Sequence, residues 1–528
     1  MSCYLHGIRN GINLIGSLFL LHLFPSKLNY FMFFFNRKIP TLIFIGLYIS
    51  FIVFFLYSKF TYHELWKDEW QAWLMARDMG WGELLGSLYY EGHPALWYLY
   101  LKVWSLLSYG GNDELFIQLA HASLIIGAYT LVWFRFQIPI WLKGLILLSY
   151  YPFFEYGIVS RGYAFVMLIG FAIALLLPKV ISTRDAQGSR NLKILALLFF
   201  LFCQTEVYAV MMAGALLFYI FLEKNGLQKF SSVMKDKTFS TLMWSCFGGV
   251  IIFLISVFPR TNEVDLSRAY LSKPLSGEIF FKGFQGMLAN TFWIGSIPDT
   301  NVFGVNELGL IFSVLVVSGL IYLFRKERNI LYTVLFFMFG YFIFLITIYT
   351  GGVRQWGMFF IFFLMLLQLF FLKINKSESK LDLLQTGFLL SIFIFQIHYS
   401  YLAMEKEINH PFSNAKMTAE FIKKDVPEKA SIVAINKFEI APVVGYANRK
   451  FYSLPEGETF TFFKWVEKVY LPSEKELQLF ADYKKVNRII IISPQKLDNR
   501  RYPNALLWKS FDNYSVKNEN YYLYTLGK

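Results

Sequence analysis

Long apolar runs, separated by short clusters of basic residues, constrain this chain more than any other feature of its sequence. About eleven such runs lie between residues 39 and 402. A helix needs about 20 apolar residues to cross the hydrocarbon core of a bilayer, where its backbone polar groups must be satisfied internally. Since 56% of the 528 residues are hydrophobic and 20% are aromatic, an ordinary soluble domain is excluded. The sequence predicts an all-α polytopic membrane domain.

The basic clusters predict how these runs are oriented. Cytoplasmic loops carry an excess of lysine and arginine, and every rich basic cluster falls on one side if eleven runs span. The amino terminus is then inside and the carboxyl terminus outside. The predicted spans are 39–57, 115–134, 138–157, 163–178, 194–205, 207–222, 241–258, 303–324, 330–349, 355–372 and 383–402.

Two segments decide this topology. The run Ala95 to Leu107 carries Lys102 and would be only about 20 Å long as a helix, so we place it at the membrane interface. If it spanned, all basic clusters except the first would change sides. The run 194–222 is too long for one ordinary span, and basic residues at both of its ends favour a hairpin with Glu206 at the tip.

The chain divides into three parts. Residues 1–36 form an extension that we expect to be dispensable, with Met32 as an alternative start. Residues 37–404 form the membrane domain with an outer loop at 58–114, and 405–528 form a small extracytoplasmic α/β domain. Periodicity predicts helices and strands in this last part, and a long outer loop precedes it. These are helices 414–424 and 473–483, strands 431–435, 488–492 and 521–526, and the loop 259–302.

The formal net charge of +14 indicates contact with membrane lipids and not with nucleic acid. The basic residues are spread over short loops between apolar runs, where they face anionic lipid headgroups. No patch for nucleic acid is needed to explain them.

Carboxylates and arginines are predicted to gather on the outer face. Asp68 and Glu69 begin a predicted helix, 68–79, in the first outer loop, and a simple alternative is that both are solvated charges at the positive end of the helix dipole. The same topology, which rests only on lysines and arginines, brings further ionisable residues to that face. A carboxylate can take the proton of an acceptor hydroxyl, and guanidinium groups bind phosphate in bidentate geometry. These further residues are His93, Glu155, Arg161, Tyr163, Glu206 and Arg354.

Two stretches of the first outer loop carry a family resemblance. DEWQAWLMARD, which starts at Asp68, and YEGHPALWYLYLK, which starts at Tyr90, are similar to the first loop of the GT-C glycosyltransferases that use polyprenyl-phosphate sugars. The likeness is to the bacterial branch with protein-mannosyltransferase-like and aminoarabinose-transferase-like enzymes. It implies a sugar donor on a polyprenyl phosphate, and a bacterial cytoplasmic (inner) membrane with the active site outside. Weaker similarities are VSRGYAF, TEVYAVM, GGVRQWGMFF and FYSLPEGETFTFFKW.

The resemblance also implies roles for individual residues. Asp68 would be the catalytic base with Glu69 as its companion, and Arg354 and Arg161 would hold the donor phosphate. His93 stands where some members have lysine. A divalent cation such as Mg²⁺ or Mn²⁺ stays open, and the metal-ligand candidates are Asp68, His93 and Glu206.

Each further candidate has a structural alternative. Arg354 could be a flanking residue that reaches the interface, and His93 could be a turn residue before Pro94. Glu206 could be hydrogen-bonded inside its hairpin, and Tyr163 could be an interfacial aromatic residue. Glu155 and Arg161 stand where other members carry a further acidic residue.

The predicted function is inverting transfer of one sugar to a lipid, glycan or protein acceptor on the outer side. A transporter or flippase of lipid-linked substrates is the main alternative, but it predicts ionisable groups at the bilayer midplane and an inverted repeat. A non-catalytic membrane scaffold is the second alternative. Sugar and acceptor are left open by the sequence.

Overall fold

The computed structural model describes residues 40–108, 111–182, 186–258, 276–293, 307–377, 380–464 and 470–527. The extension 1–36, with the predicted start at Met32, lies outside these residues. Most of the predicted loop 259–302 lies outside them too. Its described part forms helix α14 (Gly277–Gln285) and the π-helical turn η4 (Gly286–Asn290).

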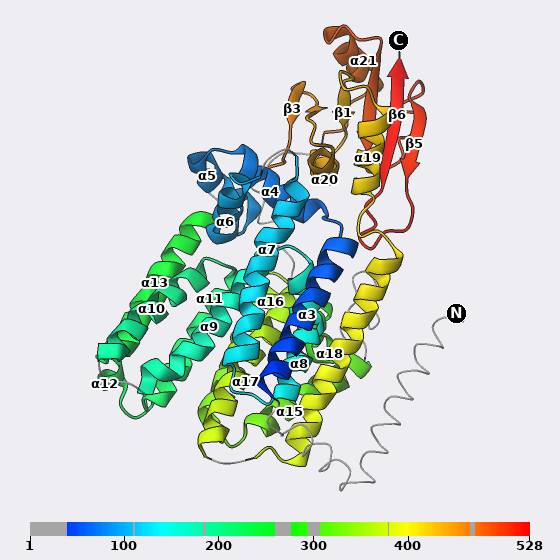
Figure 1. Cartoon of the computed structure of the whole chain (residues 1–528). Coiled ribbons are helices and arrows are strands. Elements are labelled where there is room, and N and C mark those ends of the chain that lie inside the picture. Colours follow the sequence, from blue (N-terminus) through cyan, green and yellow to red (C-terminus); the bar gives the residue numbers. More distant parts are fainter. Residues whose placement is uncertain are drawn as a thin grey trace.

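The membrane domain is a bundle of helices, and eight of those described are long and apolar enough to cross a membrane. This confirms the predicted polytopic helical fold and makes the chain an integral membrane protein. Figure 1 shows these helices in the bundle, and each of the eight coincides with a predicted span. They are α3 (Thr41–Tyr62), α7 (Asp113–Thr130) with η1 (Leu131–Arg135), α9 (Tyr163–Ser182), α13 (Lys237–Val257), α15 (Glu307–Phe324), α16 (Arg328–Thr347), α17 (Val353–Lys376) and α18 (Leu383–Asn409).

The other three predicted spans are helical too but are not among these eight helices. Helix α8 (Ile140–Leu148) continues into the π-helical η2 (Tyr151–Ile158), which has a proline in its first turn. Helices α10 (Ala186–Cys203) and α11 (Val207–Glu223) form the predicted hairpin. Residues 204–206 are its tip, and Glu206 is the N-cap residue of α11. A short helix, α12 (Phe230–Met234), precedes α13.

The segment that is predicted to be the first outer loop folds into three short helices, α4 (Lys67–Asp78), α5 (Trp81–Glu91) and α6 (Ala95–Ser105). With 11 residues α6 is about 16 Å long, too short to span. Lys102 on α6 is buried and donates to the carbonyl oxygens of Met79 (2.7 Å) and Arg77 (3.2 Å). This lysine therefore joins α6 to the carboxyl end of α4.

The carboxyl-terminal part is a mixed six-stranded sheet with helices, which confirms the predicted α/β domain. The strand order is β3-β2-β1-β4-β6-β5, and β1 is parallel to both β2 and β4. Four elements here were not predicted: α20, β2, β3 and β5. The elements are α19 (Ala415–Asp425), β1 (Ile432–Ala434), α20 (Lys437–Ala447), β2 (Phe451–Ser453), β3 (Glu458–Phe460), α21 (Glu474–Tyr483), β4 (Arg488–Ser493), β5 (Leu506–Phe511) and β6 (Tyr521–Gly527).

This α/β domain lies at the same end of the bundle as α4, α5 and α6 (Figure 1). Helix α20 packs on α4, where Gly445 approaches the ring of Trp70 so closely that a Cβ atom would overlap it. The amide N–H of Leu65 donates to the Tyr446 hydroxyl at 2.6 Å. The domain thus covers the first outer loop.

Candidate active site

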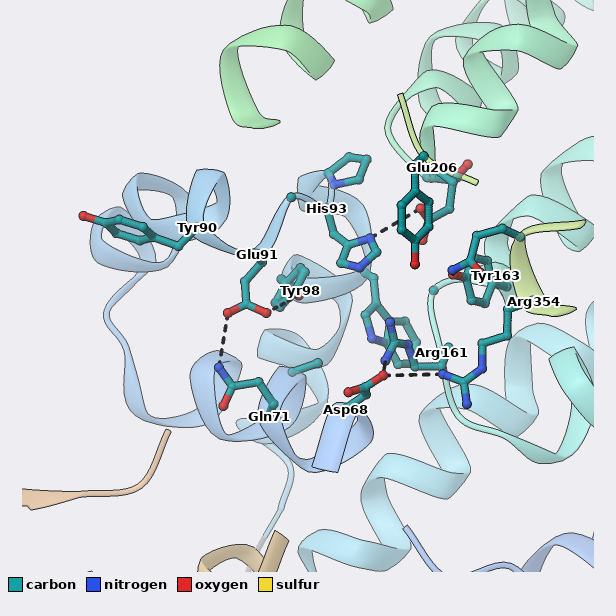
Figure 2. Close-up of a pocket in the computed structure, with 18 of the residues that line it drawn as sticks. Asp68, Gln71, Tyr90, Glu91, His93, Tyr98, Arg161, Tyr163, Glu206 and Arg354 are labelled. Carbon is teal, nitrogen blue, oxygen red and sulfur yellow. Dashed lines mark hydrogen bonds and ion pairs between the residues drawn. The ribbon is translucent and has the colours of Figure 1, made fainter. Parts of the chain in front are cut away.

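A cavity of about 440 Å³ lies at this end of the bundle, between the first outer loop and the membrane helices. It brings together six of the eight candidate residues that the sequence predicts, although they are far apart along the chain (Figure 2). These six are Asp68, His93, Arg161, Tyr163, Glu206 and Arg354.

Two guanidinium groups meet one carboxylate in this cavity. Arg161 Nη1 lies 2.5 Å from Asp68 Oδ2, and Arg354 Nη1 lies 3.4 Å from the same oxygen (Figure 2). Asp68 is in the first turn of α4, Arg161 is in the turn before α9, and Arg354 is in the first turn of α17. Three separate elements therefore supply the charges.

Arg354 is held on two further sides. Its Nε donates to Glu155 Oε1 at 2.6 Å, and its guanidinium carbon lies 4.5 Å from the ring centroid of Trp66. Glu155 is buried and also accepts from the Tyr150 hydroxyl at 2.8 Å. Glu155 does not line the cavity; it orients Arg354 from behind.

The arginines keep Asp68 ionised. Burial alone would raise the pKa of the Asp68 carboxyl, but the charges of Arg161 and Arg354 outweigh it and hold that pKa below its ordinary value. Asp68 is thus an anion at neutral pH, and a weak base while both guanidinium groups contact it.

His93 and Glu206 form a second pair in the cavity, with Nδ1 and Oε2 3.4 Å apart (Figure 2). Burial would lower the pKa of the His93 imidazole, yet the Glu206 carboxylate raises it above the ordinary value. The metal candidates Asp68, His93 and Glu206 do not form one ligand set. Within the described ranges, no three His, Cys, Asp or Glu side chains are grouped so that they could hold a metal ion.

Glu69, the predicted catalytic companion of Asp68, does not face the cavity. It belongs to a sealed cluster, which we call the His63 cluster and define as His63, Glu69 and Glu407. His63 Nδ1 lies 2.5 Å from Glu407 Oε1, and His63 Nε2 lies 3.0 Å from Glu69 Oε1. Glu69 also accepts from the amide N–H of Ser160 at 2.5 Å. The structure thus places the Glu69 carboxylate outside the cavity, where it accepts from interior donors and holds the backbone next to Arg161.

Among the lining residues that the sequence analysis missed, three form a hydrogen-bonded group. Gln71 Nε2 donates to Glu91 Oε1 at 3.2 Å, and the Tyr98 hydroxyl donates to Glu91 Oε2 at 3.3 Å (Figure 2). We call Gln71, Glu91 and Tyr98 the polar wall of the cavity. The sequence contained one signal for Gln71. This residue follows Asp68 by three positions, so the two side chains lie on the same face of the helix.

Comparison with known proteins identifies the fold. No protein-family model matches the sequence, and no curated protein matches it. The crystal structure of ArnT from Cupriavidus metallidurans in the apo state is similar, with a TM-score of 0.50 and 12% identity over 92% of this chain and 97% of that chain. The structure of that ArnT bound to undecaprenyl phosphate gives a TM-score of 0.49 with the same identity and coverage. The chain thus has the fold of that ArnT.

Proposed function

We propose that this protein is a membrane glycosyltransferase that moves a sugar from a polyprenyl-phosphate donor to the hydroxyl group of a lipid, glycan or protein acceptor. The reaction would take place on the outer side of the membrane. The GT-C fold and the first-loop resemblance support this class of enzyme.

The convergence of Arg161 and Arg354 on Asp68 carries the proposal. Two guanidinium groups that already share one anionic oxygen form a site for a second anion, since arginine matches phosphate oxygens in bidentate geometry. Glu155 and Trp66 hold Arg354 in place, so little side-chain entropy is lost when phosphate binds.

The same contacts suggest how the base is activated. When the donor phosphate takes the guanidinium groups, Asp68 loses part of the positive charge that lowers its pKa and gains a negative neighbour. Its pKa rises towards the range of an effective base only in the presence of donor.

The proposed reaction is a single displacement. The acceptor oxygen forms a bond to the anomeric carbon while the bond from that carbon to the phosphate oxygen breaks. The phosphate leaves with the electron pair next to Arg161 and Arg354, and Asp68 accepts the acceptor proton. The anomeric configuration inverts, and the products are the glycosylated acceptor and polyprenyl phosphate.

A divalent cation is not used in this scheme. The Asp68 carboxylate is taken by two cationic side chains, and His93 pairs with Glu206, so the residues present do not fit a shared ligand set. Dependence on Mg²⁺ or Mn²⁺, which the sequence leaves open, is tested by chelation and metal re-addition.

The outer location can be tested by labelling of cysteine variants in intact membranes. Ser413, an obvious choice from the sequence, is buried and donates to Glu519 Oε2 at 2.6 Å, so a thiol there would be shielded. Lys429 is exposed in the α/β domain, and Ser377 is exposed at the end of α17. An impermeant thiol reagent should label Lys429→Cys and not Ser377→Cys. The reverse pattern would place the cavity inside.

The enzymatic proposal is tested by mass spectrometry of surface glycolipids and glycans from cells with and without this protein. We expect one sugar to be missing from one acceptor in its absence and restored by the wild-type chain. Identical glycan profiles would contradict the proposal, whereas accumulation of the lipid-linked substrate on the inner leaflet in the absence of the protein would support a flippase instead.

A further inference from the structure

The proposed reaction uses Asp68 and the two arginines of the central cavity, but it leaves the polar wall without a role. The polar wall lies on one side of the cavity, whereas Arg161 and Arg354 lie on the other side (Figure 2). In a polyprenyl-phosphate donor the sugar is joined directly to the phosphate. Since the two arginines are proposed to hold that phosphate, the sugar would occupy the remaining part of the same cavity, next to the polar wall.

Glu91 is the acidic member of the polar wall, and both of its hydrogen-bond partners in the described part of the chain are neutral. Gln71 Nε2 lies 3.2 Å from Glu91 Oε1, and the Tyr98 hydroxyl lies 3.3 Å from Glu91 Oε2. Each oxygen of a carboxylate can accept two hydrogen bonds. Both Glu91 oxygens can therefore accept one more hydrogen bond from a ligand in the cavity.

The cationic side chains that line the cavity are engaged with other carboxylates. Both arginines contact Asp68, and His93 contacts Glu206. Burial raises the pKa of the Glu91 carboxyl, and its two hydrogen bonds and the charge of His93 offset this only in part. The Glu91 carboxylate is thus stabilised by a ligand that donates hydrogen bonds to it, and it is destabilised by a second anion.

The α/β domain helps to hold the polar wall in place. The side-chain amide of Gln71 accepts from the Phe463 N–H at 3.1 Å and donates to the Phe463 carbonyl oxygen at 2.5 Å. Gln71 is on α4, Glu91 is the last residue of α5, and Tyr98 is on α6. Three helices and one loop of the α/β domain therefore fix the Glu91 carboxylate before a ligand binds, which lowers the entropy cost of binding.

We infer that Glu91 determines which sugar the donor carries. It accepts hydrogen bonds from hydroxyl groups of the sugar and excludes sugars that carry a carboxylate or phosphate group of their own. This inference rests on the proposed function and specifies its substrate class, a polyprenyl-phosphate donor with a non-acidic sugar. Gln71 and Tyr98 position the Glu91 carboxylate, while the arginines keep the phosphate and Asp68 remains the base.

Binding of three lipids by the full-length protein in detergent tests this inference without any transfer reaction. The lipids are undecaprenyl phosphate, undecaprenyl phosphoryl-glucose and undecaprenyl phosphoryl-glucuronate. The two glycosylated lipids differ only in a hydroxymethyl group that is a carboxylate in the second. At about pH 8, where carboxyl groups are ionised, we expect the wild type to bind the glucose lipid at least about tenfold more tightly than the glucuronate lipid, because like charges in one cavity repel.

A pair of glutamine variants assigns this preference to Glu91. Glu91→Gln keeps the size of the side chain and removes its charge, so it should reduce the preference for the glucose lipid at least about threefold. Glu83→Gln is the matched control, because Glu83 is on the same helix, is exposed and does not line the cavity. It should keep the preference of the wild type. The midpoint of thermal unfolding checks that both variants are folded, and the wild-type comparison does not depend on either of them.

Equal affinity of the wild type for the two glycosylated lipids would overturn the inference. Binding of undecaprenyl phosphate alone, or an unchanged preference in Glu91→Gln, would overturn it as well. These results would leave the proposed function standing, whereas failure of the wild type to bind any of the three lipids would reject the proposed donor. A preference that Glu91→Gln reduces, without a missing sugar in the glycan comparison, would reject transfer and not the binding role of Glu91.

Discussion

Asp68 and Glu69 are neighbours in the first turn of one helix, yet they lie in two regions with opposite properties. Asp68 opens into a cavity with Arg161 and Arg354, whereas Glu69 is enclosed with His63 and Glu407. Successive residues of an α-helix point about 100° apart. Asp68 is thus available to a ligand in the cavity, whereas Glu69 stabilises the interior of the protein.

The two regions are physically connected. Glu69 accepts from the amide N–H of Ser160, the residue before Arg161, and Glu407 lies near the end of α18, which leads into the α/β domain. The His63 cluster therefore holds together the elements that position Asp68 and Arg161. The roles of these two adjacent carboxylates are therefore set by the groups that each one contacts, and not by their proximity in the sequence.

The sharpest test of this comparison is Asp68→Asn. The substitution keeps the size of the side chain but removes the base, and general-base catalysis contributes typically 10²- to 10⁴-fold. We expect transfer by purified protein to fall at least about a hundredfold, with expression and thermal unfolding nearly unchanged. Full activity of Asp68→Asn, combined with loss of activity in Glu206→Gln or Glu155→Gln, would move the base to the later outer segments.

Glu69→Gln should show the opposite pattern. Glu407 still balances the charge of His63 in this variant, but the charged acceptor for His63 Nε2 and for the Ser160 amide N–H is lost. A hydrogen bond to a charged group contributes about 1.5 to 3 kcal/mol. We expect a clearly lower midpoint of thermal unfolding, while the transfer rate per folded molecule falls much less than in Asp68→Asn. An unchanged midpoint with abolished transfer would instead return Glu69 to the catalytic machinery.

The His63 cluster also predicts a pH dependence of stability. Burial would lower the pKa of His63, but Glu69 and Glu407 outweigh it and raise that pKa to about 9. Because the folded pKa lies above the ordinary value of about 6.5, the stabilisation is complete below pH 6.5 and is lost as pH rises through about 9. Over this range the unfolding midpoint of the wild type should therefore fall relative to that of His63→Gln, since buried Lys59, which also interacts with Glu69 and Glu407, is present in both proteins. In His63→Gln this part of the pH dependence should be absent.

The smallest effects are expected for two carboxylates on the rim of the same loop. Asp78 is paired with Arg77 near the surface, and Glu83 is exposed, 3.7 Å from Lys464. Exposed pairs of this kind contribute about 0 to 1 kcal/mol. Asp78→Asn and Glu83→Gln should therefore change transfer by less than about twofold. A large loss in either variant would show that acidic residues of this loop act as a group.

The membrane part was predictable because a strong constraint acts on it. The length of the apolar runs located the eight helices that are long and apolar enough to span. The short, lysine-bearing segment at Ala95 forms a helix of 11 residues, which is too short to cross the membrane. Five α/β-domain elements were also predictable from amphipathic or alternating patterns. One of these is α21, where Ser473 caps the helix as expected.

The remaining elements of the α/β domain and the orientation of the site side chains depend on tertiary contacts, which leave only weak signals in the sequence. Helix α20 contains Pro442 and Gly445, and strands β2 and β3 have three residues each. For the site, the sequence predicted which charges share a face but not which way they point. Glu69 turns inward because His63 and the Ser160 amide are there to bind it.

Binding of undecaprenyl phosphate tests most directly the central claim that Arg161 and Arg354 hold the donor phosphate beside Asp68. Hydrogen bonds to charged groups contribute about 1.5 to 3 kcal/mol each, so the double variant Arg161→Ala/Arg354→Ala should bind this lipid at least about tenfold more weakly than the wild type. The Asp68→Asn variant should bind undecaprenyl phosphate at least as tightly as the wild type, because loss of the Asp68 charge frees both guanidinium groups. Equal affinity of the wild type and the double alanine variant would contradict the claim.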